Sequence, residues 1–128
     1  MLGLSANLNY YLFNGNVDLR KGIFRLCESI REEMSLDPSD ASNVYMFMSR
    51  NRKVVKILHY ERGFYVLYEK RPVMGKFKKP VFDEVSKCYR IQWSDMAYLT
   101  ESIVVDKMYV SPKDLSLIHI LETTRPEP

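Results

Sequence analysis

Short apolar runs separated by polar turns dominate this chain and predict a protein built mainly from strands. Runs rich in β-branched and aromatic residues are typical of strands, because such side chains fit a pleated, half-buried surface. Strands are expected at residues 9–13, 44–48, 53–60, 64–70, 88–93 and 104–110. The second, third and fourth runs are joined by turns of a few residues, which favours an antiparallel meander.

One helical repeat interrupts this pattern. Apolar residues recur at helical spacing at Leu19, Ile23, Leu26, Ile30 and Met34. Asp18 is the expected N-cap of this helix. Arg20 and Lys21 would then lie in its first turn. They are either solvated charges that are not optimised for helix stability, or cationic side chains that together with the free backbone N–H groups would hold a phosphate or a carboxylate. Ser94 is expected to cap a second, short helix that ends near residue 103.

The turn between the third and fourth runs leaves two strand registers open. If Arg62 and Gly63 form a two-residue turn, Lys56 faces Glu69, which is a favourable cross-strand pair. If the turn also includes Glu61, Lys56 faces Tyr68 instead. The opposite charges of Lys56 and Glu69 favour the first register.

These elements predict an α+β fold, with an antiparallel β-meander of about four to six strands packed against one main helix, plus a short second helix. Residues 1–113 are expected to form a single domain, because nothing resembling a flexible linker divides them. Residues 114–128 do not continue the pattern. We interpret them as an irregular tail and suspect a non-native origin.

The charge is distributed unevenly along the chain. Residues 50–79 carry ten Lys or Arg against two Glu, a local charge of +8 in a chain whose net charge is +3. A basic stripe interleaved with aromatic residues is typical of a surface that meets a polyanion. The alternative interpretation is a solvated sheet face whose charges protect strand edges. On the first interpretation, the candidate DNA contacts are Arg20, Lys21, Arg50, Arg52, Lys53, Lys56, Lys70 and Arg71, and the candidate partner contacts are Tyr60, Phe64 and Tyr68.

Several functional classes have no support in the sequence. No apolar run approaches the roughly 20 residues of a membrane-spanning helix, and no signal peptide is visible. Neither His59 nor His119 has a partner at metal-ligand spacing, so no metal or cofactor is expected and the chain is not expected to be an enzyme. Cys27 and Cys88 have no redox-motif spacing, and Cys27 is expected to be a buried free thiol. A cytoplasmic protein fits these features.

Five segments resemble one bacterial family in their order and spacing. They are the helix start Asp18-Leu19-Arg20-Lys21-Gly22, the strand and turn over residues 44–52, the central residues 56–71, the Gly75-Lys76-Phe77 segment with Pro80, and Trp93. Together they resemble the accessory protein of insertion sequence 66 elements, which is called TnpB in those elements. That family is unrelated to the RNA-guided nucleases that share the name.

The resemblance implies a non-catalytic helper of DNA transposition, encoded beside a separate transposase. Two partners are consistent with it. The basic hairpin would contact the DNA of the element through its phosphates, or the aromatic residues would dock the protein on the transposase.

Overall fold

The computed structural model describes residues 4–14, 18–20, 22–81 and 86–105. Their elements follow in the order β1 (Asn9–Phe13), α1 (Ile23–Glu33), β2 (Asn43–Met48), β3 (Val55–Glu61), β4 (Phe64–Lys70), β5 (Lys76–Phe77), β6 (Cys88–Ile91), α2 (Trp93–Glu101) and β7 (Ile103–Val104). The predicted domain boundary at residue 113 and the interpretation of residues 114–128 lie outside the described residues. In the described part of the chain, no helix is long and apolar enough to span a membrane.

The α+β class is confirmed, and so is the predicted meander. In the described residues, one sheet has the strand order β4-β3-β2-β1-β6, and β5 pairs separately with β7. Strands β2, β3 and β4 are antiparallel neighbours, and Lys56 faces Glu69 as the two-residue turn requires. Arg62 and Gly63 both have positive φ, at 46° and 87°, which is the geometry of a type I′ hairpin turn.

One strand pairing of the main sheet, at β1, is not part of the predicted antiparallel meander. This strand pairs in parallel with β2, with Tyr11 opposite Tyr45, and antiparallel with β6 on its other side. Parallel strands need a crossover connection, and α1 supplies it by returning the chain to the starting end of the sheet. The strand–helix–strand order in the sequence permits this arrangement but does not require it.

Both predicted helix starts need correction. Helix α1 begins at Ile23 with Gly22 as its N-cap, so Arg20 precedes the helix and does not lie in its first turn. Asp18 forms a local turn in which its carboxylate accepts a hydrogen bond from the Arg20 N–H at 3.0 Å. Helix α2 begins at Trp93 rather than after Ser94, because Gln92 and Asp95 form a reciprocal capping box.

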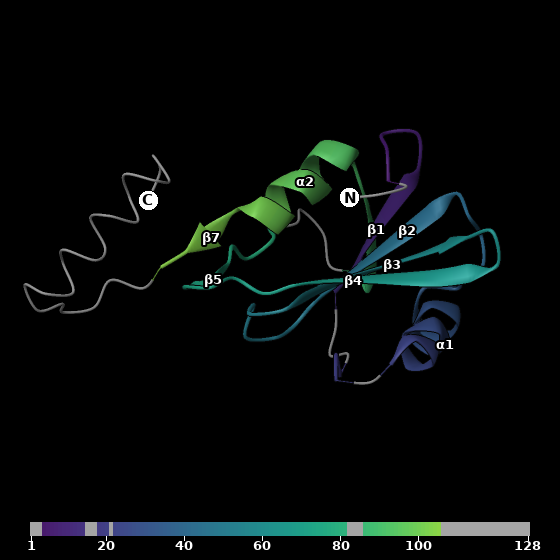
Figure 1. Cartoon of the computed structure of the whole chain (residues 1–128), viewed down its shortest axis with the longest axis horizontal. Coiled ribbons are helices and arrows are strands. Elements are labelled where there is room, and N and C mark those ends of the chain that lie inside the picture. The colour runs from purple at the N-terminus through teal and green to yellow at the C-terminus, as the bar shows by residue number, and fades with distance from the viewer. Residues whose placement is uncertain (1–3, 15–17, 21, 82–85, 106–128) are drawn as a thin grey trace, which may run out of the picture.

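The sheet is the middle of three layers, with α1 and α2 on opposite faces (Figure 1). Side chains alternate between the two faces along each strand. On the α1 side, Tyr45, Phe47 and Leu58 pack against Leu26, Cys27 and Ile30. On the α2 side, the core comprises Tyr10, Leu12, Val44, Met46, Val55, Ile57, Phe77, Met96 and Leu99. Cys27 is the buried free thiol that we predicted, and burial raises its pKa.

Tyr45 gives the fold a dependence on alkaline pH. Its hydroxyl donates to the Asp37 carbonyl at 2.8 Å and accepts from the Asn43 carboxamide at 3.1 Å. Burial raises the pKa of Tyr45 from 10.0 to about 12. Because folding raises this pKa, its contribution to stability is complete below pH 10 and is lost as the pH rises toward 12.

The free energy of unfolding, measured in urea, should therefore fall as the pH rises from about 10 to about 12. Tyr45→Phe should be less stable at neutral pH and less sensitive to pH in this window. Some dependence should remain, because burial also raises the pKa of Tyr10 and Tyr68. If Tyr45→Phe lost stability with pH as steeply as the parent does, Tyr45 would not be the source of the alkaline pH dependence.

Gly75 permits the close approach of β5 and β7. Its φ is +76°, and a methyl group there would meet the Val104 carbonyl oxygen well inside contact distance. Gly75→Ala is expected to cost about 1–3 kcal/mol of unfolding free energy, because both the backbone angle and the contact are unfavourable. Gly22→Ala is the matched control, because a Cβ there meets no atom within 4 Å. Equal losses in the two variants in urea denaturation would contradict this account.

Candidate nucleic-acid interface

The loop between β2 and β3 is held in one conformation by its own polar side chains. The Ser49 hydroxyl accepts hydrogen bonds from the backbone N–H groups of Lys53 and Val54, at 3.1 and 3.0 Å. The Asn51 carboxamide oxygen also accepts from the Lys53 N–H at 3.1 Å. The Ser49 N–H donates to the Val54 carbonyl, which closes the loop. The polar turn that we predicted after β2 is therefore an ordered loop, and its hydrogen bonds fix the backbone that carries Arg50, Arg52 and Lys53.

Arg52 connects the β2–β3 loop to β5 through two hydrogen bonds with Phe77. Its φ of 59° is left-handed, and its carbonyl accepts a hydrogen bond from the Phe77 N–H at 2.8 Å. Its guanidinium donates in return to the Phe77 carbonyl at 3.3 Å. Arg52, predicted as a DNA contact, is half-buried and has a structural role in addition to its charge.

On one side of the loop lies an open hollow of about 550 Å³, which we call the α1-side hollow. Its lining residues are Asp18, Leu19, Arg20, Ser49, Arg50, Asn51, Val54 and Arg71. Three arginines converge there from segments that are far apart in the sequence: the turn before α1, the β2–β3 loop and the end of β4. The structure thus brings Arg20 together with the charges of the central block.

On the other side of the loop lies the β5-side hollow, of about 510 Å³. It is lined by Arg50, Asn51, Arg52, Lys53, Met74, Gly75, Lys76 and Val105. Lys76 belongs to the basic block but was not among the predicted contacts, because the sequence shows it only in a connector. We call the two hollows and the loop between them the basic end of the sheet.

Cations outnumber carboxylates at the basic end. The two hollows are lined by six cationic side chains, and Asp18 is the one carboxylate among the described lining residues. The Arg20 guanidinium lies 3.0 Å from the Asp18 carboxylate, and this pair raises the pKa of Arg20. Its side chain nevertheless stays 92% exposed, so a ligand can reach it.

Arg71 is held over the end of β4 by Glu69. Its Nε lies 2.6 Å from the Glu69 carboxylate, and this hydrogen bond is the main cause of the lowered pKa of Glu69. The Arg71 side chain is 64% exposed. The Nε–H of Arg71 makes this hydrogen bond. The carboxylate orients Arg71 without enclosing it.

Two predicted DNA contacts are not available at this surface, one because it is buried and one because it lies on the other face of the sheet. Lys56 is only 8% exposed; its ammonium donates to the Leu19 carbonyl and lies 3.6 Å from the Glu69 carboxylate. Lys70 lies on the opposite face of the sheet, where it donates to the Thr100 carbonyl and pairs with Glu101 at 2.5 Å. The predicted basic hairpin face therefore does not exist as one surface, because the alternation of side chains divides it. The accessible charges gather instead at one end of the sheet.

The three aromatic residues predicted to contact a partner protein do not lie on one surface either. Tyr60 contacts Tyr65 edge to face, with ring centroids 5.1 Å apart. Tyr68 points to the other face and packs against the α2-side core. Phe64 is 71% exposed at the tip of the hairpin. Lys21 lies outside the described residues.

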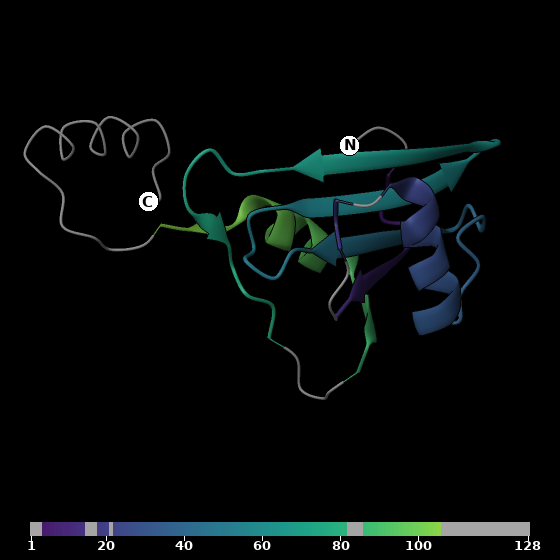
Figure 2. The ribbon, with the colours of Figure 1, turned by 90° about the horizontal axis from the view of Figure 1, so that it is seen from below.

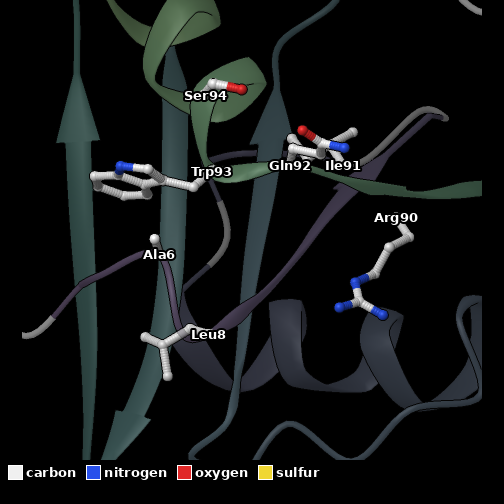
Figure 3. Close-up of a pocket in the computed structure, with 7 residues that line it drawn as sticks. All are labelled: Ala6, Leu8, Arg90, Ile91, Gln92, Trp93 and Ser94. Carbon is white, nitrogen blue, oxygen red and sulfur yellow. The ribbon is translucent and has the colours of Figure 1, made fainter.

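A third hollow, of about 610 Å³, lies at the opposite end of the sheet. Figure 3 shows its lining residues, Ala6, Leu8, Arg90, Ile91, Gln92, Trp93 and Ser94, with Arg90 and Trp93 well separated. The Arg90 guanidinium already donates to the Asn9 carboxamide at 2.5 Å and lies over the Tyr11 ring. These side chains do not converge on one point as the arginines of the α1-side hollow do.

The described residues contain no group of three or more His, Cys, Asp or Glu placed to hold a metal ion. His59 is buried, and its ring nitrogen lies 3.0 Å from the Ala41 carbonyl. This histidine therefore belongs to the packing of β3.

Comparison with known proteins agrees with the resemblance seen in the sequence. The family model described as IS66 Orf2 like protein matches residues 8–109, a range that spans every described strand and helix. No curated protein and no solved structure matches the chain. The chain belongs to the IS66 Orf2-like family and has an accessory role in the transposition of an insertion element.

Proposed function

We propose that this protein assists transposition by contacting DNA phosphates through the basic end of the sheet, without catalysing a reaction itself. The observation that carries this proposal is the convergence of Arg20, Arg50 and Arg71 on the α1-side hollow. Like charges repel one another, so surface charges that only face solvent would not be expected to cluster from three separate segments of the chain. A guanidinium presents paired N–H donors that match the oxygens of a phosphate.

The arrangement favours contacts to the DNA backbone over the reading of bases. The basic end is a loop between two strands, and no described helix projects from it into a groove. Arg50 and Lys53 are exposed on an ordered loop, while Arg20 and Arg71 are oriented by carboxylates. Contacts of this kind position a protein on a duplex and make its affinity strongly dependent on salt.

A titration of the full chain against a labelled duplex from the end of the element, followed by fluorescence anisotropy, tests the proposal. Binding should be clear at low salt and should weaken steeply as the salt concentration rises. A random duplex of the same length should bind with similar affinity, because phosphates are the expected ligands. The proposal would be overturned by absence of binding at low salt, or by an affinity that does not change with salt concentration.

Docking on the transposase is the alternative that the sequence left open. It has less support, because Tyr60, Phe64 and Tyr68 do not share one surface, and only Phe64 is largely exposed. Co-purification of the transposase with this protein after nuclease treatment would favour that alternative. Loss of co-purification after nuclease treatment would favour a link through DNA.

A further inference from the structure

The two edges of the main sheet are protected to different degrees. Strand β6 has four residues, and Ser86 blunts it because its hydroxyl donates to the Cys88 carbonyl and lies 3.4 Å from the Cys88 N–H. Strand β4 has seven residues and lies at the margin of the sheet (Figure 2). Proteins normally protect a long edge with a proline, a bulge or a charge. Residues 64–68 of β4 carry none of these.

The hairpin geometry shows which backbone groups of β4 point outward. In a two-residue hairpin the residues that flank the turn, Glu61 and Phe64, form a hydrogen-bonded pair. Alternate residues of β4 therefore bond to β3, and the N–H and C=O groups of Tyr65, Leu67 and Glu69 face away from it. The bond from the Ser49 N–H to the Val54 carbonyl agrees with this alternation, since it turns the even-numbered residues of β3 toward β2. None of these outward groups has a backbone partner among the described residues.

The side chains of β4 are also incompletely covered. Residues 65–68 are half-buried, whereas the central residues of β2 and β3 are fully buried. Leu67 and Tyr65 pack partly against the α1-side core, and Tyr68 packs against the α2-side core. One further strand alongside β4 would extend both cores and satisfy the outward groups.

A second copy of β4 is complementary to this edge. When the two copies run antiparallel about a two-fold axis at Leu67, Tyr65 faces Glu69 of the second copy and all the outward groups pair. Phe64 then faces Lys70, and no like charges oppose one another. Moving the axis to Val66 places Arg62 opposite Lys70, and moving it to Tyr65 places Glu61 opposite Glu69. Like charges directly opposite destabilise a strand pair, so the axis at Leu67 is preferred.

We infer that the protein forms a two-fold symmetric dimer in which the β4 edges of two copies pair antiparallel about Leu67, so that one sheet continues through both. The dimer does not depend on contact between the basic end and DNA. A symmetric interface of this kind uses the same patch on both subunits. Seven residues of each copy take part in the preferred register, Phe64 to Lys70, with Leu67 on the axis.

Solution mass and a strand-blocking variant provide the first test. Light scattering on the full chain should show a mass that rises with concentration toward twice the 15.1 kDa of one chain. Leu67→Pro removes an N–H that faces outward, so it should keep the β3–β4 ladder, seen by circular dichroism, and abolish the rise. A single-chain mass at every concentration, or a folded Leu67→Pro variant that still doubles its mass, would overturn the inference.

Cysteine cross-linking tests the register and does not require the proline variant to fold. In a Cys88→Ser background, Leu67→Cys should oxidise to a disulfide-linked dimer, because a hydrogen-bonded pair separates Cα atoms by about 5.5 Å. Tyr65→Cys alone should not cross-link, but a mixture of Tyr65→Cys and Glu69→Cys should. Cross-linking by Tyr65→Cys alone, or none by Leu67→Cys, would overturn the proposed axis.

Discussion

Replacing both Arg50 and Arg71 with glutamine is expected to weaken binding to duplex DNA by about 10- to 100-fold at low salt. Both side chains line the α1-side hollow, and they come from the β2–β3 loop and from the end of β4. A guanidinium that bonds a phosphate contributes more than a neutral donor, and glutamine keeps a polar, hydrogen-bonding side chain without the charge. Anisotropy titrations at fixed salt would measure the change.

A second pair of arginines provides a control with the same change in net charge. Arg31 is exposed on α1, and Arg90 is exposed on β6, at the edge of the sheet opposite β4. Arg31→Gln with Arg90→Gln should reduce affinity by less than about threefold, because distant exposed charges are screened by salt. Equal losses in the two double variants would indicate a general effect of charge and contradict a localised site.

The largest loss of stability is expected for Phe47→Ala, at about 3–5 kcal/mol of unfolding free energy. Phe47 is fully buried on the central strand β2, and its ring lies 5.6 Å from that of Phe13. Alanine would leave a cavity between the sheet and α1 that the rigid neighbours cannot fill. Urea denaturation followed by circular dichroism would measure the loss.

Phe24→Ala is the matched control for Phe47→Ala, because it removes the same ring from an exposed position. It lies on α1 but is 78% exposed, so Phe24→Ala should change the unfolding free energy by no more than about 0.5 kcal/mol. A loss below about 1 kcal/mol at Phe47 would contradict the packing of α1 on the sheet.

Local patterns were sufficient to predict the meander. The apolar runs of β2 and β4 end where turn residues begin, and Arg62-Gly63 has the glycine that a tight hairpin needs. The pairing of Lys56 with Glu69 could be predicted because a two-residue turn fixes the register of the whole hairpin. Each of these features depends on neighbours in the sequence.

Features that depend on distant contacts were not predictable. The position of β1 depends on where α1 docks, and no local pattern encodes the direction of the strand beside it. The capping signal of Asp18 was misleading, because the same carboxylate satisfies the Arg20 N–H in a turn. The strand expected at residues 104–110 overlaps β7 at Val104, and its remainder from residue 106 lies outside the described residues. Its partner β5 lies more than twenty residues away along the chain, so the connector gave no sign of β5.

The candidate site was predicted in part for the same reason. The charge block located Arg50, Arg52, Lys53 and Arg71, but strand alternation and burial separated Lys56 and Lys70 from them. The approach of Arg20 to Arg50 could not be predicted without the fold, since the two residues are thirty positions apart along the chain. Lys76 was missed because its position beside the β2–β3 loop follows from the pairing of β5 with β7.

The dependence of DNA affinity on salt tests the central claim most directly. Each phosphate contact contributes about 0.9 to the slope of the logarithm of affinity against the logarithm of salt concentration. The slope for the Arg50→Gln, Arg71→Gln variant should be shallower by roughly two than that of the parent, and the Arg31→Gln, Arg90→Gln variant should keep the parent slope. Identical slopes for all three proteins would show that the basic end does not contact phosphates and would contradict the account.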